Sequence, residues 1–453
     1  MKVHFIAIGG AVMHNLAITL RKRGYIVTGS DDEIFEPAKS RLASFGLLPP
    51  ETGWDPSKIT PDLDYVILGM HAGRENPELL KALETDVKIY SFPEFLYEQT
   101  KNKKRIVVAG SHGKTTTTAM IMHVFRHLGL KFDYMAGSSV DGFESPVGIS
   151  EDSTIAVFEG DEYLTSAIDK RPKFLHYKPD IAIINGIAWD HMNVFPTFEE
   201  YREQFRLFAE TITDGGTLIY FADDSEVKKI AAETGNNIRK IPYRVHGYFQ
   251  NKTGFYAATI CRVVPVKIFG EHNMQNLSAA REACMAAGIS EDDFYEAIQS
   301  FSGTSRRLQK IFENTNGVAF LDFAHAPSKV KATVEAVASR YPGKKVVACL
   351  ELHTFSSLNI SFLPFYRGTL ENADFRFVYF NPGVVKAKNL PPITREMVRE
   401  AFGQENTEVF DDSAEMISSI KKLNPPNPLY LFMSSGDFDG LDLKTISEEL
   451  LSD

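Results

Sequence analysis

Arg-Ile-Val-Val-Ala-Gly-Ser-His-Gly-Lys-Thr-Thr-Thr-Thr, residues 105–118, reads as a strand, a glycine turn and the start of a helix. The apolar run Ile106 to Ala109 predicts a buried strand, and a helical pattern runs from Lys114 to about Leu128. A helix that starts at a glycine turn directs free N–H groups and its positive dipole end at an anion. Lys114 can reach the β- and γ-phosphates of a nucleotide, and the Thr115 hydroxyl can ligate Mg²⁺. The stretch therefore predicts a nucleoside-triphosphate site in an α/β domain.

The turn is a short form of the phosphate-binding loop. The strict pattern needs a glycine where this chain has Val108, so the match is to Gly-x-x-Gly-Lys-Thr. An ordinary glycine-rich turn is the alternative, although such a turn rarely has Lys-Thr at the helix start. The expected cradle consists of Gly110, Ser111, His112, Gly113, Lys114, Thr115 and Thr116.

Composition limits the class of protein. A chain of 453 residues suggests two to four domains, most simply three, and 43% hydrophobic with 24% charged residues is ordinary for a globular protein. The formal net charge of −10 argues against a general nucleic-acid binder. The three cysteines show no Cys-x-x-Cys spacing, and no apolar run approaches the roughly 18 residues of a membrane span. We expect a cytoplasmic protein with neither nucleic-acid nor membrane partners.

The N-terminal part, residues 1–102, predicts a β-α-β unit. A strand from Val3 to Ile8 is followed by Gly9-Gly10, a helix, a second strand at 25–28 and then Asp31. As a dinucleotide fingerprint it is weak, because the template needs glycines where Ala7 and Val12 stand. A helix that starts beside two glycines can still bind a diphosphate, and a Rossmann-like turn without ligand is the alternative.

The central part, residues 103–302, adds polar groups at strand ends. A strand at 153–158 ends in Glu159, which suits a Mg²⁺ ligand, although a solvated acidic loop is the alternative. A strand at 181–184 precedes His191, near the edge where α/β sheets collect ligands, although a lone histidine is more often structural. Polar residues 270–276 precede a helix expected at 279–287, and their imidazole and amide groups can read a purine edge.

The C-terminal part, residues 303–453, predicts a second doubly wound α/β unit. Arg306-Arg307 at its entrance suit a phosphate clamp or surface salt bridges, and both interpretations stay open. A strand at 318–323 contains Asp322, and His325 follows before a helix at 328–340. Further strands at 345–350, 375–380 and 429–433 alternate with helices.

Taken together, these motifs resemble the Mur ligase family, ATP-dependent amide-forming enzymes of peptidoglycan synthesis, over essentially the whole chain. The resemblance implies an N-terminal Rossmann-like UDP-binding domain, a central P-loop ATPase-like domain and a C-terminal Rossmann-like domain for the amine substrate. The motifs that carry it are Gly9-Gly10, 110–116, Glu159, 190–192, 270–276, 306–307 and 322–327.

The resemblance also implies roles for the site residues, with ATP and two Mg²⁺ ions. Lys114, His191 and Arg306 are expected to be catalytic. Thr115 and Glu159 would ligate one Mg²⁺ and His191 the second. The residues expected to contact adenine are His272, Asn273 and Asn276. Those expected to contact the nucleotide or its phosphates are Arg306, Asp322 and His325. Those expected to contact the UDP sugar are Gly9, Gly10, Asp31 and His71.

Within the family, the glycine pair and the Ser-His-Gly-Lys-Thr turn resemble the branch that starts from UDP-N-acetylmuramate. One member of that branch adds L-alanine, and the other reattaches the recycled tripeptide L-Ala-γ-D-Glu-meso-diaminopimelate. Segments 162–177 and 433–440 resemble the tripeptide-adding member, which we prefer. The implied roles are in peptidoglycan recycling, cell shape and cell division, by a monomer or homodimer.

Three departures from the family pattern stand out. Gly186 and Ala188 occupy positions where the family usually has Asn and Glu. Phe205 stands where some members have a carbamoylated lysine, so we predict no such modification. Segment 351–359 lacks an arginine that the family tends to place there, which predicts altered recognition of the acidic peptide.

Two other functions remain to be weighed. A nicotinamide oxidoreductase built on the N-terminal β-α-β unit leaves Lys114-Thr115 unexplained. A non-catalytic nucleotide switch would bind ATP without forming an amide.

Overall fold

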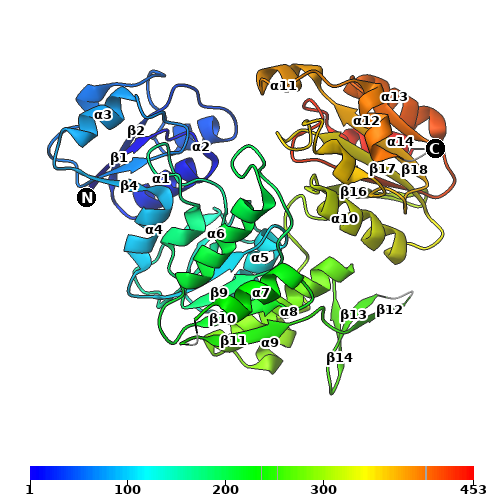
Figure 1. Cartoon of the computed structure of the whole chain (residues 1–453), viewed down its shortest axis with the longest axis horizontal. Coiled ribbons are helices and arrows are strands. Elements are labelled where there is room, and N and C mark those ends of the chain that lie inside the picture. The colour runs from blue at the N-terminus through cyan, green and yellow to red at the C-terminus, as the bar shows by residue number, and fades with distance from the viewer. Residues whose placement is uncertain (236, 252–253, 404–405, 453) are drawn as a thin grey trace. The chain divides into compact units, whose positions relative to one another are not determined.

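The computed structural model describes residues 1–235, 237–251, 254–403 and 406–452. The chain forms three mainly parallel sheets and a small antiparallel one, which confirms the predicted three-domain α/β class (Figure 1). By compactness it divides into one unit of residues 1–187, 202–244 and 279–297, and another of 188–201, 245–278 and 298–453. The predicted domain ranges stay predictions. No helix among the described residues is both long and apolar enough to cross a bilayer.

The N-terminal sheet has the strand order β2-β1-β3-β4, and its strands are parallel. The apolar residues that predicted strand β1 are buried on both faces, since Phe5 and Ile6 are fully buried. The predicted diphosphate turn joins β1 to helix α1. The elements are β1 (Lys2–Ile6), α1 (Ala11–Lys22), β2 (Ile26–Ser30), α2 (Ala38–Ser44), η1 (Pro56–Lys58), β3 (Tyr65–Leu68), α3 (Pro77–Leu83), β4 (Lys88–Ser91) and α4 (Phe92–Thr100).

The central sheet has seven strands in the order β11-β10-β9-β5-β8-β6-β7. Strand β5 lies between β8 and β9, so the turn after it adjoins the ends of both neighbours. Helices α5 to α7 flank this sheet (Figure 1). Its strands are β5 (Lys104–Ala109), β6 (Asp133–Met135), β7 (Val147–Gly148), β8 (Ile155–Glu159), β9 (Ile181–Ile184), β10 (Thr217–Phe221) and β11 (Arg239–Tyr243). Its helical elements are α5 (Lys114–His127), η2 (Lys173–His176), α6 (Phe198–Glu210) and α7 (Ser225–Glu233), followed later by α8 (Glu271–Ala287) and α9 (Glu291–Ile298).

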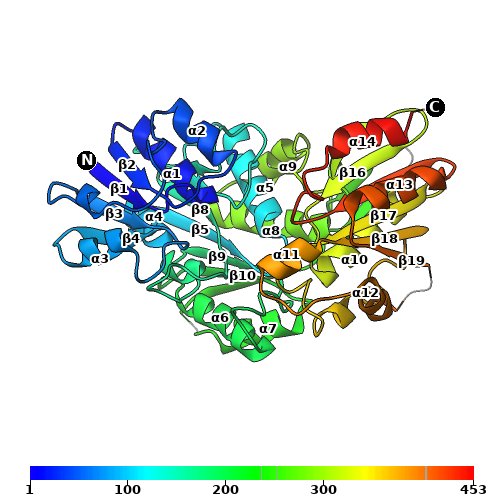
Figure 2. The same ribbon diagram turned by 90° about the horizontal axis from the view of Figure 1, so that it is seen from above.

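The C-terminal sheet has six strands in the order β15-β16-β20-β17-β18-β19, with β15 the antiparallel edge. Helices α13 and α14 pack on one face around Phe377, Met416 and Ile420, and α10 covers the other (Figures 1 and 2). The strands are β15 (Gln309–Glu313), β16 (Val318–Asp322), β17 (Lys345–Leu352), β18 (Phe375–Phe380), β19 (Thr407–Phe410) and β20 (Pro428–Met433). The helical elements are α10 (Pro327–Arg340), η3 (Leu363–Tyr366), α11 (Pro382–Ala387), α12 (Arg395–Phe402), α13 (Ser413–Leu423) and α14 (Leu443–Leu450).

Helix α8 and a small antiparallel sheet are among the differences from expectation. Helix α8 begins at Glu271 rather than near residue 279, so the predicted purine-reading residues lie within its first two turns. A three-stranded antiparallel sheet, absent from the sequence prediction, contains β12 (Tyr248–Gln250), β13 (Phe255–Ala258) and β14 (Val263–Val266).

Candidate functional site

The turn between β5 and α5 has the geometry of a phosphate cradle. Gly110 has φ 136° and Gly113, which caps α5, has φ 73°, both values that favour glycine. A Cβ on Gly110 would lie 3.0 Å from the backbone nitrogen of Asn185. The glycines therefore let the chain bend tightly and bring the first N–H groups of α5 to the turn.

Lys114 is held in this cradle as a charged group. Its Nζ donates to the Gly110 carbonyl at 2.7 Å and pairs with Glu162 Oε2 at 2.7 Å. Burial acts to lower the pKa of Lys114, but the carboxylates of Glu162, Asp161 and Glu159 outweigh it and raise that pKa. A fully charged ammonium at the start of α5 suits binding to phosphate oxygens. Glu162 was not predicted as a site residue.

Thr115 and Glu159 lie together, as the sequence interpretation requires. The Thr115 hydroxyl donates to Glu159 Oε1 at 2.9 Å, and Glu159 Oε2 accepts the Gly137 N–H at 2.6 Å. Glu159 is 8% exposed at the end of β8. A hydroxyl and a carboxylate beside a phosphate cradle offer the oxygen ligands that Mg²⁺ prefers.

Gly186, one of the departures from the family pattern, supports the turn sterically. It has φ 152°, and a Cβ there would lie 2.7 Å from the His112 ring. Its carbonyl accepts the Ser111 N–H at 2.9 Å. The neighbouring Asn185 donates to the Thr117 hydroxyl at 3.0 Å and accepts from Tyr243. The absence of a side chain at residue 186 therefore makes room for the His112 imidazole.

Three of the four predicted UDP-sugar residues lie together at one turn. Asp31 Oδ2 accepts the Gly9 N–H at 2.6 Å, and Gly10 caps α1, so these three lie at one turn. Burial, helped by the neighbouring Asp32, raises the pKa of Asp31 to about 6. His71 lies exposed in the loop after β3.

The other predicted ATP residues belong to the second compact unit. Helix α8 carries His272, Asn273 and Asn276, and the Asn273 side-chain amide donates to the Phe269 carbonyl at 2.8 Å. Asn273 and Asn276 are buried. Buried amides in the first two turns of a helix suit recognition of a flat polar ligand.

His191 occupies a strained turn. Its φ is 55°, and Asp190 Oδ1 accepts the His191 N–H at 2.8 Å. Asp190 Oδ2 lies 3.7 Å from Lys329 Nζ. Burial acts to raise the pKa of Asp190, but Lys329 and the nearby histidines 191 and 325 lower it.

Three predicted residues lie at the carboxyl edge of the C-terminal sheet. Asp322 accepts the N–H groups of Leu308 at 2.6 Å and Ala324 at 2.7 Å, and burial raises its pKa. His325 hydrogen-bonds the Phe323 carbonyl through Nδ1 at 2.8 Å. Burial, with Lys329 nearby, lowers the pKa of His325 to about 3, so this imidazole is neutral.

Arg306 is the third of these residues. It has φ 56° and donates to the carbonyls of Ser434, at 3.4 Å, and Gly436. The guanidinium is therefore fixed to the loop that follows β20, at the same sheet edge as Asp322.

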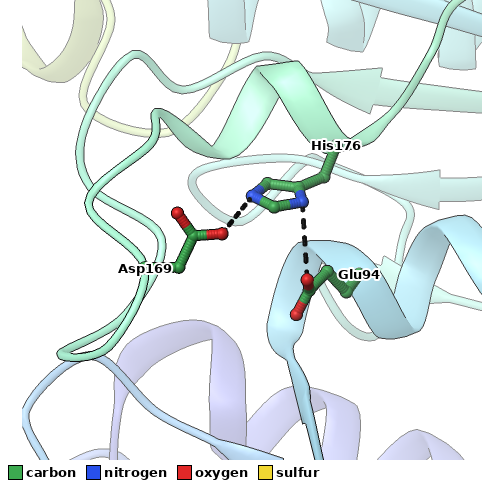
Figure 3. A group of neighbouring side chains, drawn as sticks. All are labelled: Glu94, Asp169 and His176. Carbon is green, nitrogen blue, oxygen red and sulfur yellow. Dashed lines mark ion pairs between the residues drawn. The ribbon is translucent and has the colours of Figure 1, made fainter.

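Glu94, Asp169 and His176 form one further group of possible metal ligands among the described residues (Figure 3). The His176 ring lies between the carboxylates, with Nδ1 3.8 Å from Glu94 and Nε2 3.4 Å from Asp169. The carboxylates face different ring nitrogens, and Arg171 already pairs with Asp169 at 2.7 Å. We therefore interpret the group as a charge contact between α4 and the segment after β8, and we assign no metal to it.

The fold and the cradle define a nucleotide-dependent α/β enzyme. The Mur ligase middle domain matches residues 108–284, and the Mur ligase family catalytic domain matches residues 2–104. The chain belongs to the Mur ligase family and is an ATP-dependent, amide-bond-forming ligase of cell-wall peptidoglycan synthesis. Family membership leaves no support for the oxidoreductase alternative.

Individual relatives differ in the amine named. The chain is 29% identical to UDP-N-acetylmuramate–L-alanyl-γ-D-glutamyl-meso-2,6-diaminoheptandioate ligase of Haemophilus influenzae, over 98% of each chain. It is 30% identical to UDP-N-acetylmuramate–L-alanine ligase of Chlorobium chlorochromatii, over 98% of this chain and 96% of that one. The crystal structure of a murein peptide ligase from Psychrobacter arcticus matches its fold, with a TM-score of 0.66 and 24% identity, over 100% of this chain and 98% of that one.

Proposed function

We propose that the protein joins UDP-N-acetylmuramate to the tripeptide L-Ala-γ-D-Glu-meso-diaminopimelate in peptidoglycan recycling. The observation that carries the ligase chemistry is the cradle that holds a charged Lys114 beside the Thr115–Glu159 pair. The tripeptide is supported by segments 162–177 and 433–440 and by the name of the Haemophilus influenzae relative. Both the nucleotide sugar and ATP are cytoplasmic, so we expect the protein to act there.

The proposed reaction has two steps. A carboxylate oxygen of the muramate bonds to the γ-phosphorus of ATP, and the bond from that phosphorus to ADP breaks. The amine nitrogen then bonds to the carbonyl carbon, phosphate leaves, and the nitrogen loses a proton. Two anions must approach one another in the first step, so Lys114 and Arg306 would stabilise the charge that develops on the phosphoryl oxygens.

The residues fit a bound Mg²⁺ ion. Thr115 and Glu159 would hold one ion, because a hydroxyl and a carboxylate offer the oxygen donors that Mg²⁺ prefers. The family resemblance assigns His191 to a second ion. Bound Mg²⁺ would neutralise phosphate charge during transfer. Around it, Glu162 keeps Lys114 charged and in place, and Gly137 fixes the Glu159 carboxylate.

We assign the substrates to the three predicted domains. The UDP sugar would bind to residues 1–102 at Gly9, Gly10, Asp31 and His71, and the amine to residues 303–453. In the central domain, residues 103–302, the adenine would contact His272, Asn273 and Asn276. Asp322 and His325, with Arg306, would contact the nucleotide or its phosphates.

L-Alanine is the second candidate amine. The relative from Chlorobium chlorochromatii is named for it, and the relation to this chain is as close. In addition, segment 351–359 has no arginine with which to bind the carboxylates of an acidic peptide.

Phosphate release with each amine separately tests the proposal. Purified protein with Mg-ATP and UDP-N-acetylmuramate should turn over with the tripeptide at a higher kcat/KM than with L-alanine. Lys114→Met should lower kcat at least roughly 100-fold, since it removes a cation from the transition state. Lys131→Met, at a side chain that is 67% exposed, is the matched control and should keep full activity. Turnover with L-alanine alone would overturn the tripeptide assignment, and turnover with neither amine would overturn both.

A further inference from the structure

The turn that carries His191 is held in an unfavourable backbone conformation. An L-residue with φ 55° costs about 1 kcal/mol or more, and such strain persists only where the surroundings fix it. Within the turn, Asp190 Oδ1 accepts the His191 N–H, and the His191 carbonyl accepts the N–H groups of Val194 and Phe195 at 2.8 and 2.9 Å. These contacts shape the turn, and something outside it must hold its position.

Helix α10 supplies that outside contact. Lys329, in its first turn, places Nζ 3.7 Å from Asp190 Oδ2, the oxygen that the His191 N–H does not use. The Lys329 side chain is 17% exposed and that of Asp190 9%, so water screens this pair weakly. Trp189 adds an edge-to-face contact with Phe365, at 6.3 Å between ring centres.

The two contacting pairs, Asp190 with Lys329 and Trp189 with Phe365, belong to one compact unit. Residues 188–201 group with residues 298–453 of the C-terminal part, and not with the remainder of the central sheet. A predicted metal ligand, His191, is therefore attached to the same body as Arg306 and Asp322.

We propose that Lys329 is a positioning residue, whose ammonium holds Asp190 and thereby fixes the His191 turn on helix α10. The consequence for catalysis requires that His191 is a Mg²⁺ ligand, and it therefore rests on the proposed function. The anchoring itself does not. Loss of the ammonium should leave the turn more mobile and the second metal site poorly formed.

Tryptophan fluorescence tests the anchoring without metal or nucleotide. The chain has two tryptophans, so a Trp54→Phe background leaves Trp189 as the reporter inside the turn. Lys329→Met should raise acrylamide quenching of Trp189 about twofold, because the turn opens more often. Asp190→Asn should do the same, and the double variant should add nothing further. Lys329→Arg should restore the native value.

Lys331→Met is the matched control. It lies in the same helix, its side chain is 52% exposed, and it pairs only loosely with Glu335 at 3.9 Å. Equal quenching in the Lys329→Met and Lys331→Met variants would overturn the proposal. If Lys329→Met does not fold, Lys329→Gln replaces it in the same comparison.

Magnesium dependence tests the catalytic consequence. In Lys329→Met, the Mg²⁺ concentration for half-maximal ligase activity should rise about tenfold, as for other residues that orient a metal ligand. The KM for UDP-N-acetylmuramate should stay unchanged. An unchanged Mg²⁺ dependence would overturn the link to His191. If the native protein has no ligase activity, the proposed function fails, and the fluorescence comparison still decides the anchoring.

Discussion

Glu162 gives Lys114 a carboxylate partner in the phosphate cradle. Burial of the ammonium is tolerated because this partner lies 2.7 Å away and is itself only 1% exposed. A phosphate oxygen of a bound nucleotide can occupy the position of the Glu162 carboxylate beside Lys114, because both groups are negatively charged. The sequence could not single out Glu162 among the acidic residues after β8. Lys173 pairs with the neighbouring Asp161 at 2.6 Å, and this pairing depends on the path of the loop.

We therefore predict that Glu162→Gln destabilises the protein without nucleotide by about 1–3 kcal/mol, because it weakens the pairing of a buried charge. ATP should then raise the Tm of this variant more than that of the native protein, since phosphate replaces the missing charge. Thermal unfolding with and without Mg-ATP measures both effects. Glu144→Gln, at an exposed side chain, is the control. An equal ATP-induced shift in both variants would contradict the role given to Glu162.

Asp31 provides a pH-dependent prediction. Its pKa is about 6 in the folded protein against 3.8 ordinarily, so the folded state binds this proton more tightly. The resulting stabilisation is complete below about pH 3.8 and is lost as the pH rises through about 6. The stability of Asp31→Asn relative to the native protein should therefore increase between pH 4.5 and 7.5, by at most roughly 2 kcal/mol.

Thermal unfolding at both pH values measures this difference. Asp152→Asn is the control, because its carboxylate is exposed and the pKa of Asp152 is lowered by Lys131. A difference between Asp31→Asn and native protein that does not change with pH would show that Asp31 has an ordinary pKa.

At the scale of elements, the turn after β9 leaves space for a side chain of the phosphate cradle. Gly186→Ala would place a Cβ 2.7 Å from the His112 ring, in a backbone conformation that alanine rarely adopts. We predict a loss of about 1–3 kcal/mol in stability and an increased KM for ATP, because His112 must move. Gly235→Ala is the control, since a Cβ there meets nothing within 4 Å. Equal Tm and KM values in the two variants would refute the steric account.

The elements that were predicted well are those with a simple apolar pattern. Residues 106–109 of β5 are fully buried, so a continuous apolar run indicated a central strand correctly. The start of α8 was predicted too late because Asn273, Gln275 and Asn276 are polar yet buried, which hides the helical periodicity. Strand β12 has only three residues, and its aromatic residues Tyr248 and Phe249 are both exposed, so no alternation of buried apolar and exposed polar residues marks it in the sequence.

At the scale of the whole molecule, the predicted ATP residues are distributed over two compact units. Residues 110–116 and Glu159 belong to one, and His191, Arg306 and Asp322 to the other. No sequence pattern indicated this division, because His191 follows a strand of the central sheet while its turn groups with the C-terminal part. Asp190 and Trp189 of this turn make long-range contacts with Lys329 and Phe365 of the C-terminal part, which a sequence pattern does not reveal.

The central claim is that this ligase attaches a tripeptide to UDP-N-acetylmuramate. The most direct test supplies equal concentrations of the tripeptide and L-alanine in one reaction with Mg-ATP, and identifies the UDP-linked product by mass spectrometry. We predict that UDP-N-acetylmuramoyl-tripeptide predominates with the native protein and with Lys131→Met, and that Lys114→Met forms at least roughly 100-fold less product in the same time. A predominance of UDP-N-acetylmuramoyl-L-alanine, or the absence of both products with the native protein, would contradict the account.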